Sequence, residues 1–500
     1  MQTLDLIIIF GYLIGITLFG IYFSGKQKTT EDYFVGDRNV PWWAIAASIV
    51  ATETSTITFI SVPGIAFVRN GNFEFLQVVF GYLVGRVVIS LVFIPLYFKG
   101  ELQTVYQLLG ERFGLKVKML ASSLFVIMRN IADGIRLLLT AIVLAAVYTA
   151  FVPGSDPTTV IIASIVLLGA VMIVFTFFGG MEAVIWVEVV QLAIYIGGAI
   201  AAAVVLINQI DGGFSQAIAI GEQFNKFQIF DFALDFTKTY TFWAGLLGGC
   251  FLTMSTHGTD QYLVQRYLCT DKASRASLAL LSSGAVVLGQ FIGFLFIGVL
   301  LFAFYAPYTN AAEYVNAGVA GSGVPATFPF AGGDQVFPDF ITKSMPSGLS
   351  GLVVAAIFAA ALSSSLNSIA ATAVNDLYKP FTKEKTDKHF LKVSGWLTLI
   401  IGVVQITVAI SLISAKSSAL SQALSVASLI NGPILGVFLV GTFLKKAREI
   451  HALIGMGASI CLMLYILFGT KIAWTWYALI GSLTTFFVAL LASLIIKNND

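Results

Sequence analysis

The stretch WAIAASIVATETSTITFISVPGIAFV, residues 43–68, is long enough to cross a bilayer as a helix but has a polar block at its centre. This block, residues 51–59, holds one carboxylate and five hydroxyls: Glu53, Thr52, Thr54, Ser55, Thr56 and Thr58. Hydroxyl side chains compete with the backbone for hydrogen bonds and so loosen a helix. Backbone that unwinds at membrane depth has to line a cavity, where its carbonyl oxygens suit a small cation. The pattern therefore predicts a broken helix and an ion site; the alternative is a polar helix face packed against its neighbours.

The composition places most of the chain in lipid. Of its 500 residues, 11% are charged and 58% are hydrophobic, and the mean hydropathy is +0.90. Soluble proteins are about 25% charged, so this chain lacks the side chains to cover a water-facing surface. We therefore expect one integral membrane domain over residues 1–500, with the N-terminal apolar run kept as a helix rather than removed as a signal peptide.

The same composition argues against several functions. A net charge of +2 without a basic face argues against nucleic-acid binding. Cys250, Cys269 and Cys461 stand apart and the three histidines are scattered, so we expect neither a disulfide framework nor a cysteine or histidine metal site. The sequence has no GxxxxGK[ST] motif for ATP and no Ser/His dyad, so neither an ATP-driven pump nor an enzyme is predicted.

Thirteen segments are apolar and long enough to span a bilayer. They cover residues 5–24, 43–68, 75–98, 118–149, 159–178, 184–207, 239–265, 275–305, 349–378, 391–414, 418–443, 449–469 and 473–496. Of the 28 Lys and Arg, nineteen fall in connections on one side, six fall on the other, and Arg86, Arg129 and Arg136 fall inside helices. Basic residues gather on the cytoplasmic side, so we expect the N-terminus outside and the C-terminus in the cytoplasm of a plasma membrane such as the bacterial inner membrane.

Seven ionisable residues stand out at membrane depth, where a charge costs about 2.5–3.5 kcal/mol and needs a partner or a function. They are Glu53, Arg86, Arg129, Asp133, Arg136, Glu188 and Asp260. Asp133 is four residues from Arg129 and three from Arg136, so the three side chains share a helix face and are predicted to neutralise one another.

A second hydroxyl cluster occurs in AAALSSSLNS, residues 359–368. Its small residues let another backbone approach closely, and its consecutive serines offer neutral oxygens. Paired with the polar block at residues 51–59, this cluster predicts cation coordination between two helices.

At these residues the sequence resembles the solute:sodium symporter family. The matching stretches are KTTEDYFVGDRNVPWWAIAASIVAT (28–52), FTFFGGMEAVIWVEVVQ (175–191), GTDQYLVQRYL (258–268), LNSIAATAVNDLYKPF (366–381) and NGPILGVFLVGTFLKKA (431–447). The resemblance implies an all-α LeuT-type fold with two inverted repeats, residues 43–207 and 239–443, in which helices 43–68 and 239–265 are interrupted. Residues 5–24 form an extra first helix, and residues 449–496 form two extra C-terminal helices.

The resemblance also implies a sodium site. Carbonyls of Ala51, Thr54 and Ala360 and hydroxyls of Ser363 and Ser364 match its ligands when the helix is counted forward from Gly351. Counted backward from Asn367, Ala360 and Ala361 occupy the hydroxyl positions instead. A second ion site in some members implies a role for Glu188 and Ser365, and Glu53 stands where one branch has a sodium-associated Asp.

Substrate contacts in the family come from several core helices. The corresponding candidates here are Glu53, Ser55, Thr58, Gln77, Asp133, Arg136, Asp260, Gln261, Gln290 and Ser425, with Phe59, Phe80, Tyr262 and Phe291 as gates.

The resemblance therefore implies a monomeric symporter that moves Na+ with a small polar solute. Residues 11–65 look closest to the sialic-acid branch, so sialic acid or a related sugar or organic acid is the first expectation. The alternatives are a proton-coupled, amino-acid or monocarboxylate symporter that uses Glu53 or Glu188 as carrier, and, in another class, a sodium-responsive sensor or channel-like protein.

Overall fold

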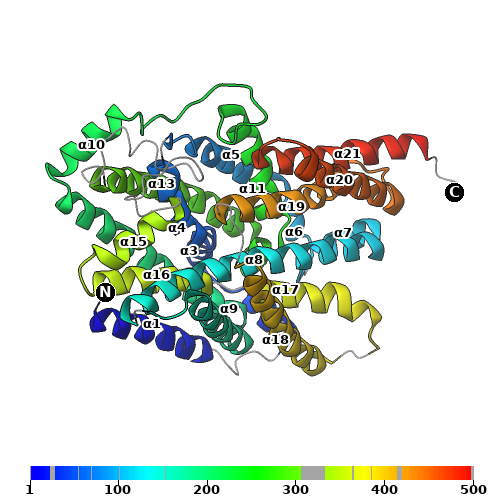
Figure 1. Cartoon of the computed structure of the whole chain (residues 1–500). Helices are drawn as coiled ribbons and strands as arrows, with labels where there is room; N and C mark the ends of the chain where they lie inside the picture. The colour runs from blue at the N-terminus through cyan, green and yellow to red at the C-terminus, as the bar shows by residue number, and fades with distance from the viewer. Residues whose placement is uncertain are drawn as a thin grey trace.

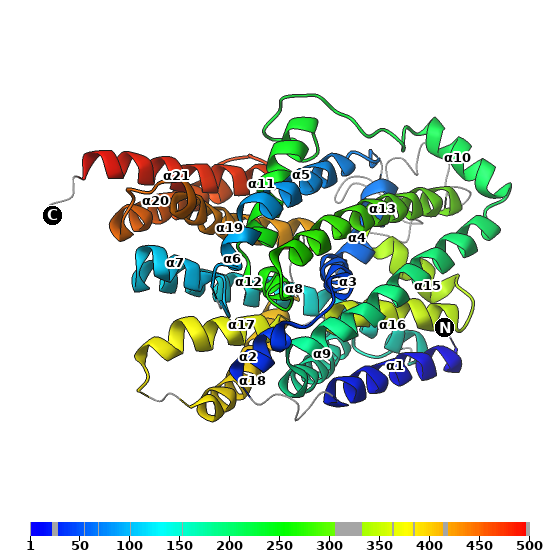
Figure 2. The ribbon, with the colours of Figure 1, turned by 180° about the vertical axis from the view of Figure 1, so that it is seen from behind.

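The computed structural model describes residues 2–22, 29–54, 56–68, 70–100, 102–152, 154–305, 333–362, 365–383, 386–413 and 419–496. The secondary structure in these residues is all helical, and the long helices form one bundle (Figures 1 and 2). The N-terminus and the C-terminus lie at opposite ends of the bundle in both views.

The long helices correspond to the predicted segments. They are α1 (Thr3–Tyr22), α5 (Leu76–Val92), α8 (Leu115–Phe151), α9 (Pro157–Gln209), α13 (Ala273–Tyr305), α16 (Leu349–Leu362), α18 (Asp387–Ser411), α19 (Ala419–Phe443), α20 (Glu449–Gly469) and α21 (Tyr477–Ile495). The short helices are α2 (Thr30–Val35), α6 (Ile94–Tyr97), α7 (Tyr106–Phe113), α10 (Gly213–Gln223), α15 (Val336–Lys343) and α17 (Leu366–Thr372). Single turns and π-helical segments cover Gly36–Arg38, Ala244–Gly248, Gly333–Gln335, Ala373–Tyr378, Lys379–Phe381 and Trp474–Trp476.

Each of the thirteen predicted segments is occupied by helix in the described residues. Eight described helices are long and apolar enough to span a membrane, and a bent pair makes a ninth. Two predicted helices, 159–178 and 184–207, run on as α9, which is kinked at Gly180 (φ 62°), a backbone conformation that favours glycine.

Two of the predicted helices are broken near their middle within the described residues, where hydroxyl or acidic side chains interrupt apolar sequence. The first consists of α3 (Trp42–Glu53) and α4 (Thr56–Phe67), and the second of α11 (Gly249–Gly258) and α12 (Gln261–Tyr267). α16 ends at Leu362 and α17 begins at Leu366, and Ser363 and Ser364 between them lie outside the described residues. The polar block at residues 51–59 therefore breaks its helix as its sequence predicts.

Glycines set how closely α5 and α11 approach each other. A Cβ atom on Gly249 would lie 2.5 Å from the Val78 carbonyl oxygen, and one on Gly81 would lie 2.2 Å from the Gly245 carbonyl oxygen. Such backbone contact is the way in which helices associate in lipid, where apolar side chains gain little from leaving their solvent. This contact places the second broken helix directly beside α5.

We expect Gly249→Val to destabilise the protein by about 1–3 kcal/mol or more, because the new side chain would push α11 away from Val78. The measurement is the thermal unfolding of purified protein in detergent. Gly197→Val is the matched control, since a Cβ at Gly197 meets nothing within 4 Å. Equal melting temperatures for the two variants would contradict the close contact of α5 and α11.

Candidate functional site

The break between α3 and α4 is held by hydroxyl groups. Thr54 is non-helical (φ −79°, ψ 62°), and the helical segments on either side are bent by 57°. The Thr54 hydroxyl lies 2.7 Å from the Val50 carbonyl oxygen and 2.6 Å from the Gln290 side-chain oxygen. The Thr58 hydroxyl donates to the Glu53 carbonyl oxygen at 2.9 Å. The last carbonyls of a helix lack their usual donors, and here side chains replace some of them.

Glu53 ties this break to two other helices. Its carboxylate pairs with Arg86 of α5 and lies 3.0 Å from Nε2 of His257 in α11. All three side chains are nearly or fully buried. A neighbouring guanidinium favours the ionised carboxylate, so this geometry favours a structural role for Glu53 over that of a proton carrier.

A second buried ion pair lies between Glu188 of α9 and Arg266 of α12, 2.5 Å apart and with both side chains fully buried. The hydroxyls of Ser48 and Thr52, both in α3, also bind this carboxylate. Arg266, which follows the predicted segment 239–265, lies inside α12, and its guanidinium turns inward to meet Glu188. The pair therefore joins α3, α9 and α12 on one side of the break.

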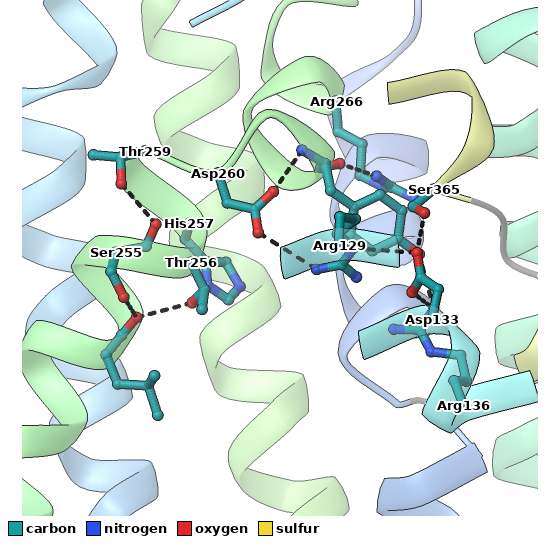
Figure 3. Close-up of polar contacts among 12 residues, drawn as sticks. Arg129, Asp133, Arg136, Ser255, Thr256, His257, Thr259, Asp260, Arg266 and Ser365 are labelled. Atoms are coloured by element: carbon teal, nitrogen blue, oxygen red, sulfur yellow. Dashed lines mark hydrogen bonds and ion pairs between the residues drawn. The ribbon is translucent and has the colours of Figure 1, made fainter. Parts of the chain in front are cut away.

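A third cluster surrounds Tyr262 in α12. Figure 3 shows its charged members Arg129, Asp133, Arg136, Asp260 and Arg266. Asp133 lies 3.4 Å from Arg129 and 3.7 Å from Arg136, so the predicted neutralisation along α8 is confirmed. Arg129 also lies 3.4 Å from Asp260, which caps α12 by accepting a hydrogen bond from the Tyr262 backbone.

Three arginines contact the Tyr262 ring as cations against a π face. The guanidinium carbons of Arg129, Arg266 and Arg136 lie 4.0, 4.6 and 5.8 Å from the ring centroid. The Arg136 guanidinium also donates to the Tyr262 hydroxyl at 3.3 Å. Such contacts hold cations in a site with little water.

The residues of the predicted sodium site lie on two adjoining parts of the fold. Ala51 is in the last turns of α3 and Thr54 is at the break, while Ala360 is in the last turn of α16. α16 packs against α4. Ser363 and Ser364 lie outside the described residues.

The three residues of the predicted second ion site face different partners. Glu188 pairs with Arg266, and Glu53 pairs with Arg86. The Ser365 hydroxyl donates to Asp133 (Figure 3).

Of the predicted substrate residues, Asp133, Arg136 and Asp260 gather around Tyr262. Gln290 and Thr58 lie at the helix break, as does Glu53, while Ser55 lies outside the described residues. Ser425 is partly buried in α19.

The other two substrate candidates hold backbone segments. The Gln77 side chain donates to the Glu74 carbonyl and accepts from the Asp231 backbone, so it fixes the start of α5. The Gln261 side chain accepts from the Val105 backbone at 2.8 Å and donates to the Gln103 carbonyl at 3.0 Å. These contacts explain their burial without a substrate.

The predicted gate aromatics fall into separate groups. Phe59 stacks on Phe337 with ring centroids 5.3 Å apart, and Phe291 stacks on Phe75 at 5.2 Å. Phe80 stacks on Phe230 in the connection between α10 and α11. Of the four gate residues, Tyr262 is therefore the one that lies in the arginine cluster.

A cavity of about 350 Å³ lies between α9 and α13. Its walls are apolar apart from Gln290, which connects it to Thr54 at the helix break. Gly293 and Phe294 are typical of its lining. This cavity lacks the several polar groups with which proteins orient a sugar, so it differs from the polar cluster around Tyr262.

Sequence reasoning missed Arg266, His257 and Ser48 as parts of this polar interior. Arg266 follows a helical break in GTDQYLVQRYL, and its position six residues after Asp260 was the available signal. His257 and Ser48 stand alone in apolar sequence, so no local pattern marks them.

We expect Glu188→Gln to destabilise the protein by about 3–5 kcal/mol, because it leaves the buried Arg266 guanidinium without its counter-charge. Asp271→Asn is the control, because its pair with Arg275 is exposed and worth at most about 1 kcal/mol. Thermal unfolding and the yield of folded protein measure both. Glu188→Gln combined with Arg266→Met should regain stability; a single Glu188→Gln variant as stable as the control would contradict the pair's importance.

A model of the sodium:solute symporter family matches residues 33–459. The chain is 32% identical to the sodium/sialic acid symporter NanT of Aliivibrio fischeri, over 99% of this chain and 94% of the relative. It is 31% identical to the sodium/sialic acid symporter SiaT of Proteus mirabilis, over 95% of this chain and 92% of the relative. The human sodium/iodide cotransporter is 28% identical over 92% of this chain and 68% of its own length.

Solved structures agree with these relatives. A sodium-coupled sialic acid symporter in a substrate-bound, outward-open state superposes with a TM-score of 0.85 at 29% identity, over 99% of this chain and 98% of the other. Mhp1, a nucleobase-cation symporter in a closed conformation, has a TM-score of 0.57 at 11% identity, over 92% of this chain and 93% of the other, and shows the fold alone. The protein is an all-helical, multi-span membrane protein with a LeuT-type fold. In such a protein sodium is a co-transported substrate rather than a cofactor. The chain therefore belongs to the sodium:solute symporter family, and it is a transporter rather than an enzyme.

Proposed function

We propose that this protein imports an acidic sugar of the sialic acid class together with sodium, by alternating access across a bacterial inner membrane. Two relatives support the substrate class, because both are named sodium/sialic acid symporters and each matches more than nine tenths of this chain. The observation that carries the proposal within the molecule is the arginine cluster around Tyr262, because a buried guanidinium group suits the carboxylate of such a sugar.

Arg136 is our candidate for binding this carboxylate. Its guanidinium is partly buried, lies 3.7 Å from Asp133 and donates to the Tyr262 hydroxyl at 3.3 Å. Guanidinium groups bind carboxylates through two parallel hydrogen bonds, which fix the orientation of the substrate as well as its charge.

The charge of this cluster supplies a physical basis for coupling. Arg129, Arg136 and Arg266 are matched by an equal number of carboxylates, those of Asp133, Asp260 and Glu188. A bound substrate anion would leave an uncompensated negative charge in a medium of low dielectric constant. A sodium ion bound nearby restores the balance, so each ligand favours binding of the other.

The proposed sodium site consists of neutral oxygens: carbonyls of Ala51, Thr54 and Ala360 and hydroxyls of Ser363 and Ser364. The break at Thr54 and the packing of α16 on α4 support this assignment. Glu53 is left out of the site because Arg86 already neutralises it. A site of neutral oxygens gains a full positive charge when it fills, so occupancy can control the charge balance around Tyr262.

The transport cycle follows from these two sites. Sodium from outside holds α3 and α16 together and raises the population of the state that binds solute. Movement of the two halves of the fold then exposes both sites to the cytoplasm. A tenfold sodium gradient supplies about 1.4 kcal/mol, and about 100 mV supplies roughly 2.3 kcal/mol for each net charge moved.

We also propose thirteen spans, with residues 43–207 and 239–443 as the inverted repeats and residues 5–24 and 449–496 as peripheral helices. Helix in every predicted segment supports this count. The termini lie at opposite ends of the bundle, as an odd number of spans requires, and the distribution of basic residues supports an external N-terminus.

The test is uptake of radiolabelled sialic acid into proteoliposomes, with pH equal on both sides. An inward sodium gradient should drive accumulation, and a potassium gradient of the same size should not. The methyl ester of the sugar's carboxylate should compete at least about tenfold less well than the acid, because it cannot pair with Arg136. Uptake that needs a proton gradient and ignores sodium would refute the proposal, and equal competition by the ester would refute the role of Arg136.

A further inference from the structure

A single lysine is buried where the connection after α10 meets the outer half of the first broken helix. Asn225 takes a left-handed conformation (φ 58°), and the Lys226 backbone N–H donates to the Gly221 carbonyl at 2.9 Å. Phe224 packs edge-on against Phe302 of α13, with ring centroids 5.1 Å apart. This turn directs the Lys226 side chain inward, where it is fully buried.

The Lys226 ammonium group binds the C-terminal end of α4. Its Nζ atom lies 3.0, 3.2 and 2.6 Å from the carbonyl oxygens of Ala66, Phe67 and Val68. An ammonium group has three N–H donors, so the three carbonyls match its full capacity. A cation at the C-terminus of a helix is favoured by the helix dipole, and the Phe302 ring, 4.1 Å from Nζ, adds a cation–π contact.

The partners of Lys226 are neutral. The elements around it carry Glu222 in α10, Tyr305 in α13, Glu74 after α4 and Asp334 in the Gly333–Gln335 turn; Arg69 lies outside the described residues. In the part of the chain that the structure describes, Lys226 forms no ion pair with a carboxylate. Burial without a counter-charge lowers the pKa of Lys226 to about 7.

We propose that Lys226 is a proton-controlled latch, which fixes the outer half of the broken helix to α10 and α13 and so sets how readily α4 moves during transport. The charged ammonium satisfies three carbonyls and the helix dipole. The neutral amine has two donors and no charge, so one carbonyl loses its partner and the attraction to the dipole disappears. The contact therefore weakens as the pH rises and Lys226 loses its proton. Lys226 is a positioning residue, and its role in transport rests on the proposed function.

The first experiment measures motion and does not require transport. A spin label on Asn70→Cys, an exposed position just past α4, reports the mobility of the end of α4. Cys461 is exposed and is changed to Ser so that it is not labelled, whereas the two other cysteines are buried. In the otherwise unchanged protein, mobility should rise between about pH 6 and about pH 8. In Lys226→Met the spin label should be mobile at both pH values. In Lys226→Arg it should be immobile at both, because arginine stays charged.

The second experiment measures sodium-driven uptake with the same pH on both sides of the membrane. In the unchanged protein, the uptake rates at about pH 8 and about pH 6 should differ by about three- to tenfold. This is the size of effect that a cation has at a partly buried helix end. The ratio of the two rates should be near one in Lys226→Met and Lys226→Arg.

Lys343→Met, which changes an exposed lysine at the end of α15, should keep the profile of the unchanged protein. A mobility independent of pH, or the unchanged pH profile in Lys226→Met, would overturn the latch. Absence of uptake with the predicted mobility changes would refute the proposed function and leave the latch standing.

Discussion

Polar groups inside a bilayer have to be satisfied by the protein itself, and this constraint shapes the centre of the molecule. The carboxylates of Glu53, Asp133, Glu188 and Asp260 are matched there by the guanidinium groups of Arg86, Arg129, Arg136 and Arg266. Some of these pairs join different helices, and others join successive turns of one helix. Charge balance and helix assembly therefore depend on the same contacts. Because breaking one buried pair costs several kcal/mol, these contacts fix the positions of the helix breaks.

The balance of internal charges also explains why a sodium ion would act on the solute site. With carboxylates and arginines already matched, an added cation has to bind neutral carbonyl and hydroxyl oxygens, and the break at Thr54 provides backbone for that purpose. The break is connected through Thr52 and Glu188 to Arg266, and from there to Tyr262. A change of charge or geometry at Thr54 therefore reaches the arginine cluster through a few direct contacts.

Much of this fold could be predicted from the sequence because lipid leaves a strong signal. Apolar segments of about 20 residues predicted the helices, and the polar block around Glu53 predicted the break between α3 and α4. Spacing along α8 predicted the contacts of Asp133 with Arg129 and Arg136, since residues three and four apart share a helix face.

The rest depended on contacts between distant segments. Nothing near Arg266 in the sequence indicates Glu188, which is 78 residues away, and the same holds for Arg86 and Glu53. Gln77 and Gln261 looked like substrate ligands because they are polar residues at membrane depth, yet they bind backbone of neighbouring connections. Lys226 was counted with the external connections, where charge is usually solvated, but the turn at Asn225 buries it.

The central claim is that the helix break at Thr54 binds sodium. Equilibrium binding of radioactive sodium to purified protein tests it directly, in the unchanged protein and in Thr54→Val, with Thr407→Val on an exposed face of α18 as the control. We expect saturable binding that survives Thr407→Val and falls by at least about tenfold in affinity in Thr54→Val, which keeps the Thr54 carbonyl ligand but removes the hydroxyl contact that shapes the break around it. Unchanged sodium affinity in a folded Thr54→Val protein would contradict it.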